Sequence, residues 1–121
     1  MSIGKSILVV DDEAFFRAVL RQMLENNGYT VLEAADGDSA VTTYREASPV
    51  LVLMDIYMPQ KNGIEATREI ISFDKSARVL ICSGSGYDDD INAALAVGAR
   101  GVISKPFFDE EVLSVISNHL R

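Results

Sequence analysis

The stretch Val50-Leu51-Val52-Leu53-Met54-Asp55 is the most hydrophobic run of the chain, and it ends on a carboxylate. Short apolar runs that are rich in β-branched residues and lack polar alternation are typical of strands buried on both faces of a parallel sheet. We therefore predict that residues 50–54 form the central strand. Three further runs are also followed by polar side chains: residues 7–10 precede Asp11 and Asp12, residues 79–82 precede Ser83, and residues 102–104 precede Lys105.

The segments between these runs have the pattern of amphipathic helices. Residues 14–27 carry apolar side chains at helical spacing, and Gly28 follows as a C-terminal stop. Further helices are expected near residues 39–46, 64–73, 88–97 and 109–120, and the less hydrophobic run 30–33 is expected to be an edge strand. Strands that alternate with helices at these lengths predict right-handed crossovers and a doubly wound α/β fold with five parallel strands and five flanking helices.

The composition indicates one globular domain over residues 1–121, with 48% hydrophobic and 24% charged residues. No apolar stretch approaches the ~20 residues of a membrane-spanning helix, and none resembles a secretory signal, so we expect no membrane partner. The net charge of −7 argues against nucleic-acid binding, which needs Lys and Arg to neutralise phosphates. The single cysteine, Cys82, lies inside an apolar run; we interpret it as a buried structural thiol, which fits a cytoplasmic location.

The polar residues that follow the strands predict a site at one edge of the sheet. In an open parallel sheet, ligands bind in the crevice beyond the carboxyl ends of the strands. Three carboxylates, one hydroxyl and one amine are therefore expected to meet there. Ionised carboxylates in such proximity repel each other unless a cation is present, and Mg²⁺ prefers oxygen ligands. The first of these loops, Asp11-Asp12-Glu13, is acidic and lacks glycine, which favours a metal over a dinucleotide.

Asp55 ends the predicted central strand, where a carboxylate can act as a nucleophile toward phosphorus and form an aspartyl phosphate. We expect the metal, the Lys105 ammonium and the Ser83 hydroxyl with nearby backbone amides to take the phosphoryl oxygens. A cis peptide before Pro106 would aim the Lys105 side chain into the crevice. Each residue alone has a simpler interpretation, as a helix cap, a turn residue or a solvated surface residue. Their joint placement at equivalent strand ends favours the site.

Nearly the whole chain resembles the receiver domain of bacterial response regulators, the CheY-like family. The matching motifs are Val9-Val10-Asp11-Asp12, Met54-Asp55 with Met58-Pro59 and Gly63, the hydroxyl of Ser83, and Lys105-Pro106-Phe107. The resemblance implies a flavodoxin-like sheet with strand order 2-1-3-4-5. It also implies that Asp55 is the phosphoacceptor, receiving its phosphoryl group from a histidine kinase, a phosphotransfer protein or a small phosphodonor.

The resemblance further implies a role for each site residue. Asp12, Asp55 and the backbone carbonyl of Tyr57 would ligate Mg²⁺ (or Mn²⁺) directly, and Asp11 would act through water. Ser83 with Lys105 would bind the phosphoryl group and couple it to the surface formed by the fourth helix, fifth strand and fifth helix, where an effector protein would bind.

One position departs from the family pattern, and two others are expected to affect the rate of dephosphorylation. The family often has an aromatic residue three positions before the lysine, whose ring turns inward on activation; here that position is Val102, which has no ring. Tyr57 and Ser85 occupy the positions that border the path of the hydrolytic water. The bulky ring of Tyr57 predicts slow dephosphorylation.

Our leading hypothesis is a stand-alone receiver that works in two-component (phosphorelay) signalling and passes its signal to a partner protein through a conformational switch. Such a protein catalyses only its own phosphotransfer and dephosphorylation, so we do not expect an enzyme with external turnover. The alternative is a phosphorylation-independent interaction module of the same fold, which Val102 supports. A phosphatase with an aspartate nucleophile ranks far behind, because it typically needs a second Asp where this chain has Tyr57.

Overall fold

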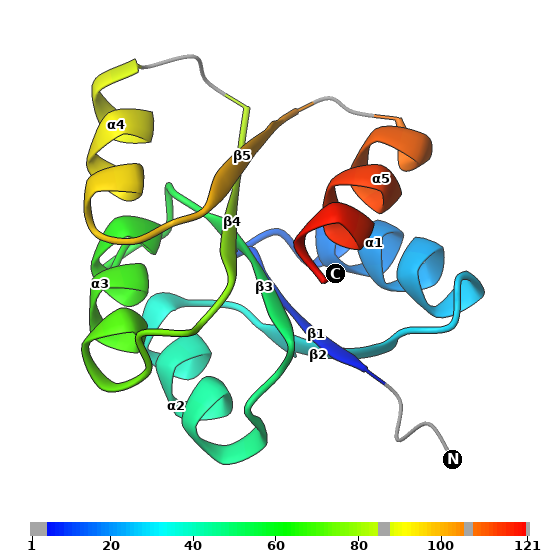
Figure 1. Cartoon of the computed structure of the whole chain (residues 1–121), viewed down its shortest axis with the longest axis horizontal. Coiled ribbons are helices and arrows are strands. Elements are labelled where there is room, and N and C mark those ends of the chain that lie inside the picture. Colours follow the sequence, from blue (N-terminus) through cyan, green and yellow to red (C-terminus); the bar gives the residue numbers. More distant parts are fainter. Residues whose placement is uncertain (1–4, 85–87, 106–107, 121) are drawn as a thin grey trace.

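The computed structural model describes residues 5–84, 88–105 and 108–120. In this part of the chain, one parallel sheet lies between two layers of helices (Figure 1). The strands are β1 (Ser6–Val10), β2 (Thr30–Ala34), β3 (Leu51–Asp55), β4 (Val79–Ser83) and β5 (Gly101–Ser104). The helices are α1 (Ala14–Asn26), α2 (Gly37–Ala47), α3 (Gly63–Phe73), α4 (Asp88–Ala96) and α5 (Asp109–His119).

The strand order is β2-β1-β3-β4-β5, and every neighbouring pair is parallel. This order confirms the predicted doubly wound, flavodoxin-like fold. β3 lies at the centre and is buried along its whole length, as its hydrophobicity predicts, whereas the less hydrophobic β2 lies at an edge. The chain winds in one direction from β1 to β2 and in the other from β3 onward, so the crevice beyond β1 and β3 lies at the point where the order reverses.

Successive side chains of each strand point to opposite faces of the sheet, and each face has its own hydrophobic core. The face covered by α2, α3 and α4 buries the strand residues Leu8, Val10, Val52, Met54, Val79 and Ile81. The face covered by α1 and α5 buries Ile7, Val9, Leu51, Leu53, Leu80 and Cys82. Cys82 is a free, buried cysteine, as predicted. The two cores hold the strand ends, and therefore the polar residues that follow them, in fixed register.

The helix ends follow the local sequence closely. α3 begins with a capping box, in which the Asn62 side chain accepts from the Glu65 N–H at 2.9 Å and the Glu65 carboxylate accepts from the Asn62 N–H at 3.1 Å. The predicted stop after α1 is confirmed, because Gly28 adopts a φ of 90°, which favours glycine. Val19 is one of the apolar side chains at helical spacing in residues 14–27, but it is 44% exposed, so the buried face of α1 is narrower than its sequence predicts.

None of the described helices is long and apolar enough to cross a membrane.

Candidate functional site

The crevice beyond β1 and β3 brings three carboxylates together. Asp55 is the last residue of β3 and its side chain is buried, as is that of Asp11, whereas Asp12 is exposed. One carboxylate oxygen from each of the three lies within 4.8 Å of the others. This convergence follows from the register, because Val10 and Met54 pair across β1 and β3 and the next residues project beyond the same edge. The structure thus places the predicted acidic residues in one cluster.

Lys105 joins this cluster from the end of β5. Its backbone N–H donates to the Ser83 carbonyl at 2.8 Å, which ties the ends of β4 and β5 together. Its Nζ lies 2.9 Å from Asp11 Oδ2 and 3.6 Å from Asp55 Oδ1. The ammonium also lies 4.1 Å from the centre of the Phe16 ring, a cation–π contact from α1. Lys105 therefore bridges the two buried carboxylates and is closer to Asp11.

The charges of the acidic cluster are not balanced, because it contains more carboxylates than cations. Burial, together with the charges of Asp11 and Asp12, raises the pKa of Asp55 to about 6 against the lowering effect of Lys105. Burial also lowers the pKa of Lys105, but its hydrogen bond to Asp11 and the charge of Asp55 outweigh this effect, so its pKa lies above the usual value. Three carboxylates face one ammonium, and a divalent cation would balance the difference.

The donor set suits Mg²⁺ or Mn²⁺. All three candidate ligands are carboxylate oxygens, the type that these hard cations prefer. Asp12 and Asp55 line an open crevice in which water can complete an octahedral shell. The crevice is lined by Asp12, Glu13, Asp55, Tyr57, Gly84 and Lys105. The residues present therefore fit the metal that the sequence predicts.

Ser83 and Gly63 complete the frame around Asp55. Ser83 is buried at the end of β4, next to β3 in the sheet. The Gly63 N–H donates to the Ile56 carbonyl at 2.8 Å, and a Cβ at Gly63 would lie 2.0 Å from the Asp55 carbonyl oxygen. Only glycine therefore lets the start of α3 approach the end of β3 so closely. This contact fixes the loop that carries Tyr57.

Tyr57 is 45% exposed and reaches from this loop to α4, where its hydroxyl donates to the Asp90 carboxylate. Tyr57 also lines the crevice, together with Asp55. Val102 of β5 is half-buried and packs against the core under α2, α3 and α4. Two other predicted positions, Ser85 and Pro106, lie outside the residues that the structure describes.

The sequence did not predict the role of two side chains that contact the backbone of the acidic loop, directly or through each other. Arg17 of α1 donates to the Asp11 carbonyl at 2.5 Å, and its guanidinium pairs with Glu33 of β2 at 3.0 Å. In the sequence, Arg17 resembles any charged residue on an amphipathic helix, and Glu33 looks like a polar residue on an edge strand. No local signal identifies them, because their contacts join segments that are distant in the chain.

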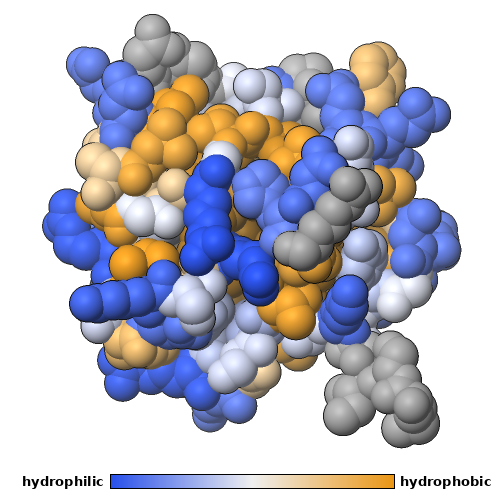
Figure 2. All heavy atoms as spheres, viewed as in Figure 1, coloured by the Kyte–Doolittle hydropathy of each residue, from blue (hydrophilic) through white to orange (hydrophobic). Residues whose placement is uncertain are grey.

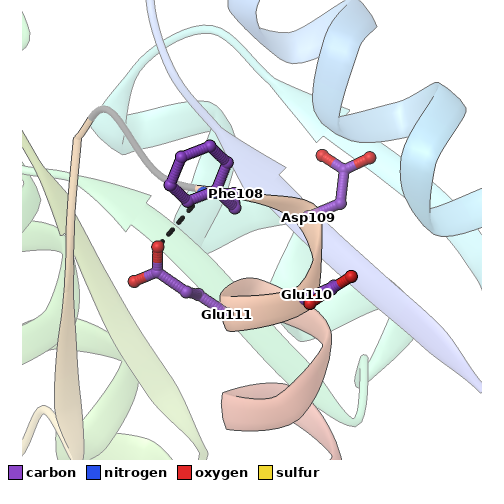
Figure 3. A pocket seen from close by; sticks show the side chains of 4 residues that line it. All are labelled: Phe108, Asp109, Glu110 and Glu111. Atoms are coloured by element: carbon purple, nitrogen blue, oxygen red, sulfur yellow. Dashed lines mark hydrogen bonds between the residues drawn. The ribbon is translucent and has the colours of Figure 1, made fainter.

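A second hollow lies at the start of α5 (Figure 3). It is lined by Phe108, Asp109, Glu110 and Glu111, and Glu111 accepts a hydrogen bond from the Phe108 N–H at 3.3 Å. All four residues are exposed. Acidic residues in the first turn of a helix are stabilised by its N-terminal partial charge, and this accounts for the cluster without a ligand.

The strand order, together with acidic residues after β1 and at the end of β3 and a lysine after β5, defines the class of CheY-like signalling domains. The comparisons agree: residues 7–117 match the response regulator receiver domain, and the chain belongs to this family. It is 42% identical over 118 residues to the chemotaxis protein CheY of Halobacterium salinarum, with 98% of each chain covered. It is 44% identical over 116 residues to CheY of Bacillus subtilis, covering 95% of this chain and 97% of that one.

Solved structures show the same fold. A CheY-like receiver domain protein from Methanospirillum hungatei superposes with a TM-score of 0.93 at 26% identity, covering 97% of this chain and 94% of that chain. The Vibrio cholerae chemotaxis protein CheY4 gives a TM-score of 0.91 at 27% identity, covering 97% of this chain and 99% of that one. The chain is therefore a response regulator receiver domain, consistent with two-component signalling.

Proposed function

We propose that this receiver is a Mg²⁺-dependent phosphoacceptor in which Asp55 is modified. The observation that carries the proposal is the convergence of the carboxylates of Asp11, Asp12 and Asp55 with the Lys105 ammonium in one open crevice. The phosphoryl group would come from a histidine kinase or a phosphotransfer protein, and the domain would act in the cytoplasm as one unit.

In the reaction, a carboxylate oxygen of Asp55 attacks phosphorus, and the bond from phosphorus to the donor's leaving atom breaks as the acyl phosphate forms. Mg²⁺, held by Asp12, Asp55 and the Tyr57 backbone carbonyl, with Asp11 acting through water, would neutralise charge on one phosphoryl oxygen. Lys105 lies close enough to Asp55 to bind a second oxygen by a small movement of its side chain away from Asp11. The Ser83 hydroxyl binds the third.

The lifetime of the acyl phosphate depends on access of water to the phosphorus. Tyr57 lines the crevice beside Asp55, and its hydrogen bond to Asp90 restrains the ring there. We therefore expect Tyr57→Asn to shorten the lifetime of the phosphoryl group, whereas equal lifetimes in variant and parent would show that the ring does not hinder water. Ser85 is the second position that we expect to border the path of this water.

Incubation with acetyl phosphate and Mg²⁺, followed by intact-mass spectrometry, tests the proposal. We expect one added phosphoryl group in the parent protein, none in Asp55→Asn, and none when EDTA replaces Mg²⁺. Asp109→Asn, which removes an exposed carboxylate from the start of α5, is the matched control and should be modified like the parent. Unchanged modification of Asp55→Asn would defeat the assignment.

The signal would leave through the surface formed by α4, β5 and α5, where an effector protein binds. Apolar side chains gather between α4 and α5 on the face seen in Figure 2, with hydrophilic side chains around them. Leu95 of α4 is 42% exposed, and Val102 of β5 is half-buried. An apolar patch with a polar surround is typical of a protein interface.

Val102 also favours a second candidate function, a receiver-fold module that binds its partner independently of phosphorylation. A valine at this position has no ring to turn inward, and here it packs against the core. Partner binding with and without beryllofluoride, which mimics the phosphoryl group, separates the two functions. A switch requires different affinities in the two states, whereas equal affinities would favour the constitutive module.

A further inference from the structure

The loop between β1 and α1 carries two of the three acidic residues, and its backbone is held by a residue outside the site. Arg17 lies in the first turns of α1, and its Nη1 donates to the carbonyl oxygen of Asp11 at 2.5 Å. The side chain of Asp11 is 2% exposed. A carbonyl in such a position needs a protein partner, and Arg17 supplies it.

Every other polar group of Asp11 also has a partner. Its N–H donates to the Ala34 carbonyl at 3.2 Å, its Oδ1 accepts from the Glu13 N–H at 2.9 Å, and its Oδ2 accepts from Lys105 at 2.9 Å. Three of these partners are backbone groups or belong to the crevice itself. Two of the four partners are charged side chains: Lys105 belongs to the crevice, and Arg17 comes from α1.

The Arg17 guanidinium is itself fixed by a second element. Its Nε lies 3.0 Å from Glu33 Oε1, and the two side chains are only 16% and 28% exposed. Glu33 is anchored in β2, opposite Val9 of β1. A guanidinium presents several donors in a rigid plane, so one side chain can bind the carboxylate and the carbonyl at the same time. The contact thus links β2, α1 and the acidic loop.

We propose that Arg17 is a positioning residue for the metal site: held by Glu33, it fixes the Asp11 carbonyl, and through it the direction in which the Asp11 and Asp12 side chains leave the loop. This inference rests on the proposed function, because it takes these carboxylates as metal ligands. The contacts of Arg17 are with the Glu33 carboxylate and the Asp11 carbonyl, and not with a carboxylate of the acidic cluster. Its effect on the site is exerted through the backbone.

The direction in which the metal affinity changes on loss of Arg17 distinguishes a positioning role from a purely electrostatic one. Removing a cation near an acidic site makes the local potential more negative, and on Coulombic grounds alone this tightens the binding of a divalent cation. Misplacing the carboxylates loosens it. Weaker metal binding after loss of Arg17 is therefore the opposite of the charge effect.

Arg21 provides a matched control on the same helix. It also pairs with Glu33, and in addition it contacts Glu25 and the Val31 carbonyl, but none of these contacts reaches the Asp11 loop. Replacing either arginine by methionine removes one cation and one partner of Glu33 while keeping a long apolar stem. The two variants differ in the contact with the Asp11 carbonyl.

The experiment is a titration of the full chain with Mn²⁺, in which electron paramagnetic resonance measures free ion, accompanied by thermal unfolding in EDTA to confirm that each variant is folded. We expect Arg17→Met to weaken Mn²⁺ binding about five- to twentyfold and Arg21→Met to stay within about twofold of the parent. Arg17→Lys keeps the cation on a shorter side chain without the planar fork of donors, so it should restore only part of the affinity. Glu33→Gln weakens the ion pair that holds Arg17, so it should lower the Mn²⁺ affinity by less than Arg17→Met does. This variant provides the test if Arg17→Met does not fold.

Each remaining outcome is decisive. Affinities of Arg17→Met and Glu33→Gln within twofold of the parent would overturn the inference, and so would an equal loss in Arg21→Met. A parent protein that binds no Mn²⁺ would overturn the proposed metal site, and this inference with it. Normal Mn²⁺ binding by the parent together with an unaffected Arg17→Met would leave the metal site standing and remove only the positioning role.

Discussion

The raised pKa of Asp55 predicts that its charge destabilises the metal-free protein. Burial, with the neighbouring charges of Asp11 and Asp12, raises this pKa from 3.8 to about 6. A shift of about two units corresponds to about 3 kcal/mol of differential interaction between the two protonation states. Asp55→Asn replaces the carboxylate by a neutral group of the same shape, so we expect the variant to be about 1–3 kcal/mol more stable than the parent at about pH 7.5 in EDTA.

The pH dependence follows from the direction of the shift. A carboxyl group whose pKa is higher in the folded than in the unfolded state binds more protons when folded, so stability falls as pH rises between the two pKa values. The penalty is therefore small near pH 4, grows up to about pH 6, and is constant above that. Urea unfolding at several pH values, monitored by circular dichroism, should show an advantage for Asp55→Asn that nearly vanishes near pH 4.

Mg²⁺ supplies the counter-test. A ligand that binds only the folded state raises its stability, and the parent holds the complete ligand set. Excess Mg²⁺ should therefore stabilise the parent more than Asp55→Asn and reduce or reverse the difference between them. If Asp55→Asn is no more stable than the parent in EDTA at any pH, then burial and the neighbouring carboxylates do not disfavour the ionised form of Asp55. The argument that the site needs an added cation would then fail.

Three further predictions concern the frame around the site. Asn62→Ala removes half of the capping box of α3 and should lower the free energy of unfolding by about 1 kcal/mol in urea titrations; an unchanged value would show that the cap contributes little. Gly63→Ala places a Cβ 2.0 Å from the Asp55 carbonyl oxygen, so we expect a loss of about 2 kcal/mol or more and slower modification by acetyl phosphate, whereas parental stability and rate would contradict the close approach. Burial raises the pKa of the Cys82 thiol to about 12, so a thiol reagent at about pH 8 should modify it only after unfolding in urea, and rapid reaction of the folded protein would refute this.

Much of the fold was predictable because local pattern and tertiary structure agree. β3 is the most hydrophobic run and is also the central strand, buried on both faces, whereas the more polar β2 lies at the edge. The helix boundaries agree within about two residues, since residues such as Gly28, which readily adopts a positive φ, mark where a helix ends. Val19 differs because helical spacing gives the direction of a side chain but not how much of the helix its neighbours cover.

The apolar runs predict which residues stand at the carboxyl ends of the strands. Since those ends meet along one edge of any parallel sheet, the pattern also predicts that Asp11, Asp12, Asp55, Ser83 and Lys105 lie at that edge. Only the packing of the whole chain shows how these side chains pair. The ammonium of Lys105 lies closer to Asp11 than to Asp55, and Arg17, paired with Glu33, binds the backbone carbonyl of Asp11. These contacts depend on side-chain directions and on the packing of segments up to 94 positions apart, which no local pattern encodes.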